Sequence, residues 1–160
     1  KLLVLVVPRH PRRFDEVATA SQSRRSSGAM PGAQDRVHLG DTMGEMDFYY
    51  ATADAAVIGG SFAPLGGQNL IEACAAGVPV VLGPSMFNFA EATRLALEAG
   101  AAVQASDAAG AVREALRLLS NAAVREKMAT AGKRLCATHR GATQKHLDLC
   151  DELLRAAGRG

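Results

Sequence analysis

The sequence has no tryptophan, and aromatic residues make up only 4% of its 160 residues. Proteins that bind single-stranded nucleic acid stack the bases on aromatic side chains, so this scarcity speaks against such a role. Charge gives the same indication, because 18 basic and 16 acidic residues leave a formal charge of only +2. Nucleic-acid binding domains usually carry a strongly basic surface. We therefore expect no nucleic-acid partner.

Paired cysteines and long apolar runs are also missing. Cys74, Cys136 and Cys150 are odd in number and far apart, with no C-x-x-C pair. This usage favours a reduced compartment that faces the cytosol over a disulfide framework. No apolar run reaches the roughly 18 residues that span a bilayer, and no basic segment precedes a signal-like core. The chain is expected to be soluble.

Several motifs that would define a nucleotide or metal site are absent as well. Neither the Walker pattern nor G-x-G-x-x-G occurs, which disfavours a P-loop ATPase and a simple dinucleotide enzyme. The four histidines and the cysteines have no metal-ligand spacing, and no Asp-x-Asp pair could hold a metal on a diphosphate. We expect a site without a metal and without a cofactor.

What the sequence does contain is enough apolar material for one domain. Hydrophobic residues make up 48% of the chain, and a chain of this length buries roughly two thirds of its unfolded surface. Residues 1–160 are therefore expected to form a single domain. The sequence begins without methionine, directly in an apolar run over residues 2–7. We expect it to be a fragment of a larger, two-domain enzyme.

Short apolar runs alternate with helical segments along the first two thirds of the chain. Strands are expected at 2–7, 36–39, 55–58, 78–82 and 101–104, and helices at 12–21, 43–52, 70–76 and 89–99. This alternation predicts an α/β fold, a Rossmann-like and mostly parallel sheet with helices on both faces. A short edge strand is expected near residues 24–27, within a loop that spans residues 23–35.

Residues 107–160 are expected to be helical almost throughout. Asp107 and Asn121 are expected to cap two of these helices, and Val112, Leu116 and Leu119 are expected to form the packed face of the first. The last helix follows Gly141. Its apolar side chains at helical spacing are expected to pack as well, and they are Leu147, Cys150, Leu153 and Leu154.

Pro8-Arg9-His10-Pro11 follows the first strand, at the edge where open α/β sheets bind their ligands. Arg9 can offer a planar fork of donors to a phosphate or carboxylate. A rigid turn with a solvated arginine is the alternative. His10 is expected to be a hydrogen-bonding turn residue rather than a general base, because no carboxylate nearby in the sequence would orient it.

The segment Gly40-Asp41-Thr42-Met43-Gly44-Glu45 follows a second strand and opens a helix. Asp41 or Thr42 is expected to cap this helix, which needs no ligand. Gly44 is expected in the first helical turn, where glycine costs about 0.5–1 kcal/mol relative to alanine. A ligand that approaches the backbone closely would explain this glycine.

The segment from Gly59 to Glu72 contains two glycine pairs, one after a strand and one before a helix. This arrangement points several backbone N–H groups and the positive end of a helix dipole at one place, which predicts a phosphate site. Glu72, about one turn along the helix, is expected to accept hydrogen bonds from ribose hydroxyls. A tight turn beside an exposed glutamate is the alternative. The next strand end, residues 83–89, could line the same cleft, with Asn88 as a helix cap.

In their order along the chain, these motifs resemble one family. They are Pro-Arg-His-Pro at 8–11, Gly-Asp-Thr-Met-Gly-Glu at 40–45, Gly-Gly-Ser at 59–61, Gly-Gly-Gln-Asn-Leu-Ile-Glu-Ala at 66–73 and Gly-Pro-Ser-Met-Phe-Asn-Phe at 83–89. From about Leu2 to the last helix, the chain resembles the C-terminal half of a 3-deoxy-D-manno-octulosonic acid (Kdo) transferase. The resemblance implies the donor-nucleotide half of a GT-B glycosyltransferase, an enzyme with two Rossmann-like halves.

The family's reaction would follow from this resemblance. Kdo is transferred from CMP-Kdo to a lipid A precursor in lipopolysaccharide biosynthesis, with inversion and without a metal, at the cytoplasmic face of the bacterial inner membrane. The general base and the membrane segment would belong to the missing N-terminal domain, so we expect no catalytic residue in this chain and no turnover by it alone. The residues that the resemblance assigns to CMP-Kdo binding are Pro8, Arg9, His10, Gly40, Met43, Gly44, Gly60, Ser61, Gly67, Gln68, Asn69 and Glu72.

The sequence departs from the family pattern at three places. Arg12 stands where the family often has glutamate, and Gln68 and Ser85 stand where it has histidine. Glutamine and serine can still form hydrogen bonds with a donor.

Two other interpretations are also compatible with the sequence. The chain could be the nucleotide-binding half of another GT-B enzyme, a UDP-sugar transferase or epimerase, or a non-catalytic binding module. The arginines at 12, 13, 24 and 25 are expected to form a solvated face, with an anionic membrane or acceptor as the alternative.

Overall fold

A computed structural model describes residues 2–138 and 142–156. The chain divides into two compact units, residues 1–52 and residues 53–160, and each has a sheet of its own. The single domain expected from the sequence stays a prediction.

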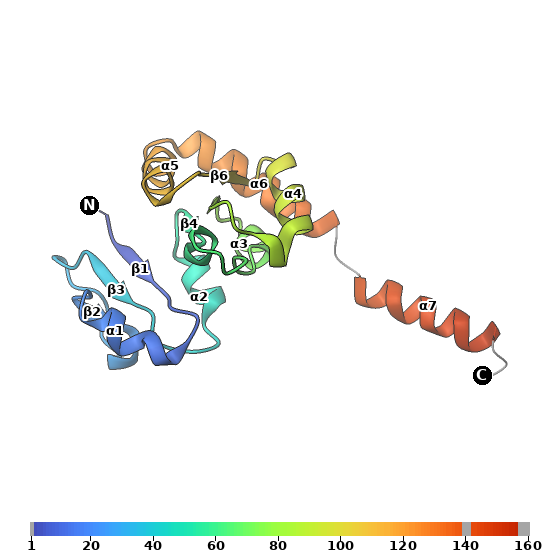
Figure 1. The fold of residues 1–160 in the computed structure, drawn as a ribbon, viewed down its shortest axis with the longest axis horizontal. Coiled ribbons are helices and arrows are strands. Elements are labelled where there is room, and N and C mark those ends of the chain that lie inside the picture. The colour runs from blue at the N-terminus through green and yellow to red at the C-terminus, as the bar shows by residue number, and fades with distance from the viewer. Residues whose placement is uncertain (1, 139–141, 157–160) are drawn as a thin grey trace. The chain divides into compact units, whose positions relative to one another are not determined.

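The first unit is built on a three-stranded parallel sheet with the order β1-β3-β2. Strand β1 is Val4–Val6, β2 is Ser23–Arg24 and β3 is Val37–Leu39. The α-helices are α1, Phe14–Ala18, and α2, Met46–Ala51, with short 3-10 helices at Pro11–Arg13 and Arg25–Ser27 (Figure 1). The edge strand expected near residues 24–27 is therefore present, but it is two residues long and turns directly into a 3-10 helix.

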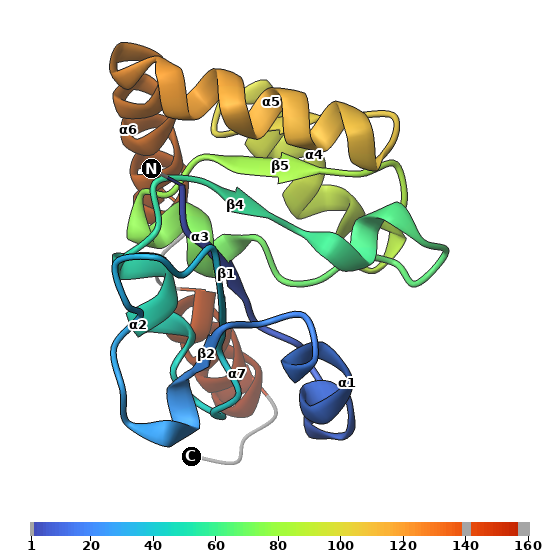
Figure 2. The same cartoon turned by 90° about the vertical axis from the view of Figure 1, so that its left-hand side faces the viewer.

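The second unit has a parallel sheet with the order β4-β5-β6. Its strands are Ala56–Val57, Val80–Leu82 and Ala102–Gln104. Its α-helices are α3, Ile71–Ala76; α4, Ala90–Glu98; α5, Ala108–Ser120; α6, Ala122–Thr138; and α7, Ala142–Ala156. Short 3-10 helices cover Gly59–Phe62 and Phe87–Phe89. Helices α3 and α5 lie on opposite sides of the sheet (Figure 2).

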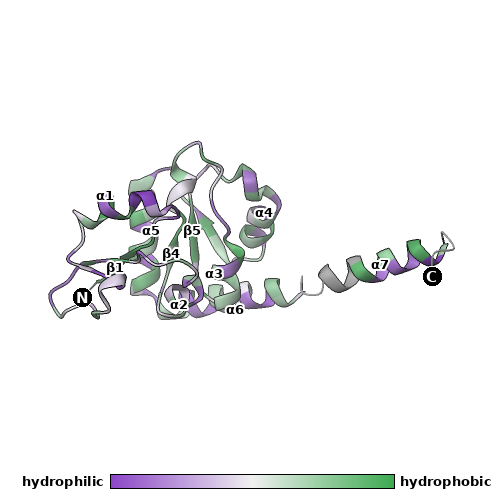
Figure 3. Ribbon diagram, turned by 90° about the horizontal axis from the view of Figure 1, so that it is seen from below, coloured by the Kyte–Doolittle hydropathy of each residue, from purple (hydrophilic) through white to green (hydrophobic). Residues whose placement is uncertain are grey.

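The core of the second unit lies around its central strand. All three residues of β5 are fully buried, because helices cover both faces of the sheet. Val81 packs in one cluster with Leu118 of α5 and Met128 of α6. Figure 3 shows the hydrophobic residues concentrated in β4 and β5. The predicted α/β fold with parallel strands is confirmed.

Helix α6 packs closely against α3. A Cβ atom on Gly132 would lie 2.9 Å from the carbonyl oxygen of Cys74, so this contact requires glycine. Burial raises the pKa of the Cys74 thiol to about 11, which keeps it protonated at neutral pH. At the other end of α6, Arg125 donates to the carbonyls of Leu118 and Leu119 at 2.8 and 2.7 Å and closes the C-terminus of α5.

Both predicted caps of the C-terminal helices are present. The Asp107 carboxylate accepts the Gly110 amide at 2.6 Å, and the Asn121 side chain accepts the Val124 amide at 3.1 Å. The predicted packing face of α5 is wrong for two of its three residues, because Val112 is 59% exposed and Leu116 is 50% exposed, whereas Leu119 is partly buried.

The face of α5 that packs on the sheet instead carries Ala111 and Leu118, which are 3% and 0% exposed. Apolar residues lie on two sides of this helix, so spacing alone does not decide between them. The side that carries alanine allows the helix backbone to come closer to the sheet.

The apolar side chains of α7 are not buried. Leu147, Leu153 and Leu154 are about half exposed, at 53%, 61% and 49%, and Cys150 is exposed, against the packing expected for them. Gly141, expected to precede this helix, lies outside the described residues. Among the helices that the structure describes, none is long and apolar enough to cross a membrane.

Candidate functional site

The candidate residues lie in turns at the carboxyl edge of each sheet. Because the strands of a sheet are parallel, the turns that follow neighbouring strands lie at the same edge. In the first unit, these turns follow β1 and β3. In the second unit, they follow β4 and β5. Each sheet thus gathers its own set of candidate residues.

Arg9 and His10 follow β1 and are exposed, whereas Pro8 is partly buried. Within the described residues, the Arg9 guanidinium has no hydrogen bond or ion pair. His10 precedes a 3-10 helix, and its carbonyl accepts the Arg13 amide at 3.0 Å, which fits the expected turn residue. Arg9 is therefore available to an anionic ligand.

The turn after β3 begins at Gly40, whose amide donates to the Val6 carbonyl at 2.8 Å. The ring of Tyr49 lies against Gly40, so that a Cβ atom there would be 2.7 Å from the ring. Gly44 lies two residues before α2, not in its first turn as expected. Its φ angle of +78° belongs to the left-handed region, which explains this glycine without a ligand.

Asp41 and Thr42 do not cap α2, contrary to the sequence-based expectation. Helix α2 begins after Glu45, without a side-chain cap. The Asp41 carboxylate, 1% exposed, instead accepts hydrogen bonds from Arg24 at 2.6 Å and from the amide and hydroxyl of Ser26 at 2.8 and 2.6 Å. Capping therefore does not account for these two residues.

Glu45 is bound in a similar way. Arg25 donates to both of its carboxylate oxygens, at 3.2 and 2.9 Å, and Thr42 also donates to it. The hydroxyl of Tyr49 lies 2.8 Å from that of Thr42. The expected solvated face is thus wrong for Arg24 and Arg25, which instead form ion pairs with Asp41 and Glu45.

The pKa of Asp41 reflects these contacts. Burial acts to raise the pKa, but the hydrogen bonds from Ser26 and the charge of Arg24 outweigh it and hold the pKa below its usual value. The carboxylate therefore stabilises the folded state fully above its unfolded pKa, about 3.9. This stabilisation is lost as the pH falls through the lower folded pKa.

An Asp41→Asn variant tests this dependence of stability on pH. Its free energy of unfolding should lie below that of the wild type by a constant amount from pH 7 to about pH 5. The difference should shrink as the pH falls below about 4, because the wild-type carboxyl then becomes neutral too. Urea unfolding of both proteins at pH 7, 5, 4 and 3 measures it. A difference that does not change with pH would contradict the ion pair.

Three backbone amides of the Gly40 turn are free to bind a ligand. Within the described residues, the N–H groups of Thr42, Met43 and Gly44 have no hydrogen-bond acceptor. The Met43 side chain is 65% exposed. A turn with consecutive unpaired amides can bind an anion.

In the second unit, the Ser61 side chain connects two turns by hydrogen bonds and does not face solvent. It is fully buried, and its hydroxyl donates to the Ile58 carbonyl at 2.5 Å and accepts the Gly83 amide at 2.6 Å. This hydroxyl is therefore already bound within the protein. Gly60 lies next to the Gln68 side chain, 3.7 Å from the position of a Cβ atom, and so both glycine segments meet at this edge.

The Gly66-Gly67 turn is supported by the segment that follows β5. Both glycines have positive φ, +80° and +74°, so the backbone alone requires them. The Ser85 hydroxyl accepts the Gly66 amide at 3.2 Å. Asn88 donates from its backbone to the Gly66 carbonyl and from its side chain to Leu65, and it does not cap α4 as expected.

After Gly66, the backbone amides of Gly67, Gln68 and Asn69 have no hydrogen-bond acceptor in the part of the chain that the structure describes. The Asn69 side chain accepts the Ile71 amide at 3.0 Å and donates to the Glu72 carboxylate at 2.9 Å. Asn69 thus orients Glu72. Helix α3 has only six residues, so an anion here would depend on these amides more than on a helix dipole.

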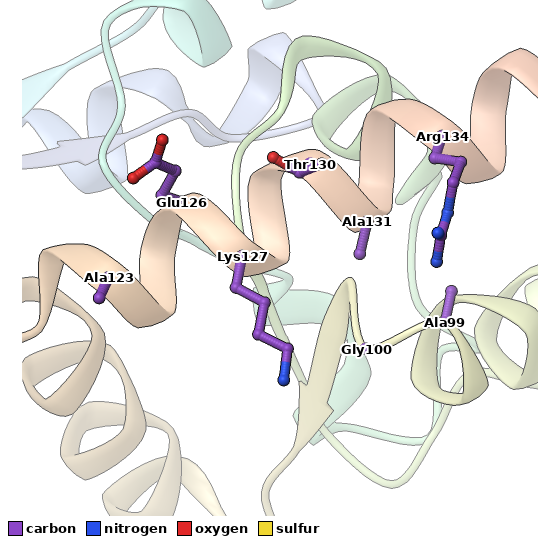
Figure 4. A pocket seen from close by; sticks show the side chains of 8 residues that line it. All are labelled: Ala99, Gly100, Ala123, Glu126, Lys127, Thr130, Ala131 and Arg134. Carbon is purple, nitrogen blue, oxygen red and sulfur yellow. The ribbon is translucent and has the colours of Figure 1, made fainter.

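A cavity of about 540 Å³ lies away from these turns. Figure 4 shows that Lys127 and Arg134 of α6 extend toward Gly100 and Ala99, at the end of α4. Ala99 and Gly100 precede β6, so this cavity lies at the amino edge of the sheet. The C-terminal carbonyls of α4 disfavour an anion there. We therefore assign the candidate site to the turns.

The class of this protein follows from its similarity to known proteins. The family model "Glycosyl transferases group 1" matches residues 24–135. The 3-deoxy-D-manno-octulosonic acid transferase of Bordetella pertussis is 54% identical over 95% of this chain, and that of Haemophilus influenzae is 38% identical over 92%. A crystal structure of the C-terminal CMP-Kdo binding domain of WaaA from Acinetobacter baumannii is 35% identical, with a TM-score of 0.79 over 84% of this chain and 73% of that one.

The chain belongs to the Kdo transferase family, within the group 1 glycosyltransferases, and its fold is similar to that of the WaaA domain. It spans 37% of the length of the Bordetella relative and 36% of the Haemophilus relative. Among the described residues, no three His, Cys, Asp or Glu side chains gather as a metal site would require.

Proposed function

We propose that this chain is the CMP-Kdo binding domain of an enzyme that transfers Kdo to a lipid A precursor in lipopolysaccharide biosynthesis. The similarity to the WaaA domain is the observation that carries this proposal. The unpaired Arg9 guanidinium and the amides of two turns are the groups that an anionic nucleotide sugar needs.

In this proposal, each set of turns has a task. Arg9, between Pro8 and His10, and the amides near Met43 contact the phosphate of CMP. The amides from Gly67 to Asn69 provide a second group of donors. Glu72 accepts hydrogen bonds from the ribose hydroxyls, in the orientation that Asn69 gives it. Ser61 acts through its buried hydrogen bonds, which fix the turn after Gly60.

The chemical role of the domain is to stabilise the leaving group. As the bond between Kdo and the phosphate breaks, negative charge grows on the phosphate oxygens of CMP. In this proposal, Arg9 and the backbone amides stabilise this charge. The proposed reaction proceeds with inversion and needs no metal or cofactor. The general base and the membrane segment belong to the N-terminal domain, so this chain binds the donor without turnover. The full-length enzyme works at the cytoplasmic face of the bacterial inner membrane.

Calorimetric titration of the 160-residue chain with CMP and with UDP tests this function. We expect CMP to bind more tightly than UDP, with the same affinity in EDTA and in Mg²⁺. Glu72→Ala should weaken CMP binding roughly tenfold, because two hydroxyl donors lose a charged acceptor.

Glu126→Ala is the matched control, since it removes an exposed carboxylate at the opposite edge of the sheet. Its affinity should equal that of the wild type. Tighter binding of UDP would assign the chain to a different nucleotide sugar. No binding of either nucleotide at millimolar concentration would count against the proposed function.

A further inference from the structure

The 3-10 helix Arg25–Ser27 lies beside the Gly40 turn because of the strand register. Arg24 of β2 is paired with Leu39 of β3, and both strands run in the same direction. The residues that follow each strand therefore emerge at the same edge. Ser26 lies two positions after Arg24, and Asp41 lies two positions after Leu39. The edge strand thus delivers a short basic segment to the candidate site.

Two carboxylates of the Gly40 turn are fully engaged by this segment. Asp41 receives four hydrogen-bond and ion-pair contacts from Arg24 and Ser26. Glu45 accepts bidentate hydrogen bonds from Arg25. The Arg25 guanidinium also lies 5.0 Å from the centre of the Phe48 ring. The amides of residues 42–44 lie between these two anchored positions.

The charges of Asp41 and Glu45 also affect the binding of an anionic ligand. Asp41 and Glu45 are negative, and they flank the amides that would meet an anionic ligand. Unpaired, they would repel a phosphate, since like charges at short range disfavour binding. Arg24 and Arg25 cancel these charges. Gly44 makes the turn intrinsically flexible, so the contacts at both ends also restrict its backbone.

We propose that Arg24, Arg25 and Ser26 are positioning residues of the donor site. They hold Asp41 and Glu45, fix the amides of residues 42–44 and neutralise the turn for an anionic nucleotide. This inference rests on the proposed function for its ligand, but not for the ordering of the turn. It gives the segment Ser23–Ser27 a role that the sequence did not suggest.

Arg25 is the residue to vary, because its ion pair with Glu45 is about one third exposed on each side and its loss should leave the unit folded. We expect Arg25→Ala to weaken CMP binding by about 5- to 20-fold, as expected for a loss of roughly 1–2 kcal/mol. Arg25→Lys keeps the charge but not the bidentate hydrogen bonds, so it should lose less CMP affinity than Arg25→Ala. Arg25→Ala combined with Glu45→Gln should recover part of the affinity, because the uncovered carboxylate is removed. A merely structural role would not produce this recovery.

Arg13→Ala is the matched control, because Arg13 makes a similar contact with Glu16 at an exposed site, and this ion pair does not include Asp41 or Glu45. Its CMP affinity should equal that of the wild type. Wild-type affinity in Arg25→Ala would overturn the inference.

Amide hydrogen exchange of the unliganded chains separates the two proposals. Arg25→Ala should speed up exchange at residues 42–44, while Arg13→Ala should not. Unchanged exchange there would overturn the inference whether or not CMP binds. Faster exchange in a chain that fails to bind CMP would support the ordering of the turn and refute the proposed function.

Discussion

Replacing Arg9 by alanine is expected to weaken CMP binding by roughly 10- to 100-fold. A hydrogen bond to a charged group contributes about 1.5–3 kcal/mol, and each 1.4 kcal/mol is about tenfold in affinity. Arg9 is exposed at the carboxyl end of β1, and within the described residues no carboxylate competes for it. Its whole donor fork is therefore available to a phosphate. Calorimetric titration at two salt concentrations measures the loss.

Arg12→Ala provides the control for this change. Arg12 is an exposed arginine of the same segment, so both variants lose one positive charge near the same place. If Arg9 only raised the local concentration of an anion, both variants would lose affinity equally, and the loss would disappear at high salt. Equal affinities of the two variants would contradict a direct contact with the phosphate.

The strand ends could be predicted from the sequence because each follows a short apolar run. The run at residues 78–82 contains β5, which is buried on both faces and therefore has no polar alternation. The caps Asp107 and Asn121 were equally predictable, since each acts within three residues along the chain. Predictions of this kind depend only on local spacing.

The contacts that shape the candidate site could not be found in this way. Arg24 and Asp41 are 17 residues apart, and they meet only because β2 lies beside β3. A strand of two residues gives no periodic signal, so its neighbour is unpredictable from the sequence. Asn88 had the composition of a cap, but its side chain binds the Leu65 carbonyl, 23 residues away.

Leu118→Ala is expected to lower the free energy of unfolding by about 2–5 kcal/mol. Leu118 is fully buried between α5 and the sheet, in contact with the cluster that includes Val81 and Met128. Truncating it removes apolar contacts and leaves a cavity that the surrounding helices cannot close completely. Since small domains have only about 5–15 kcal/mol of stability, urea unfolding should show a large shift of the midpoint.

Leu116→Ala is the matched control on the same helix. Leu116 is 50% exposed, so its truncation should change the free energy of unfolding by only about 0.5 kcal/mol. Both variants replace leucine by alanine, so the change in helix propensity is the same in the two. The two leucines belong to different faces of α5, and spacing in the sequence favoured the face of Leu116. A larger loss in Leu116→Ala than in Leu118→Ala would therefore restore the face expected from the sequence and contradict the observed packing of α5.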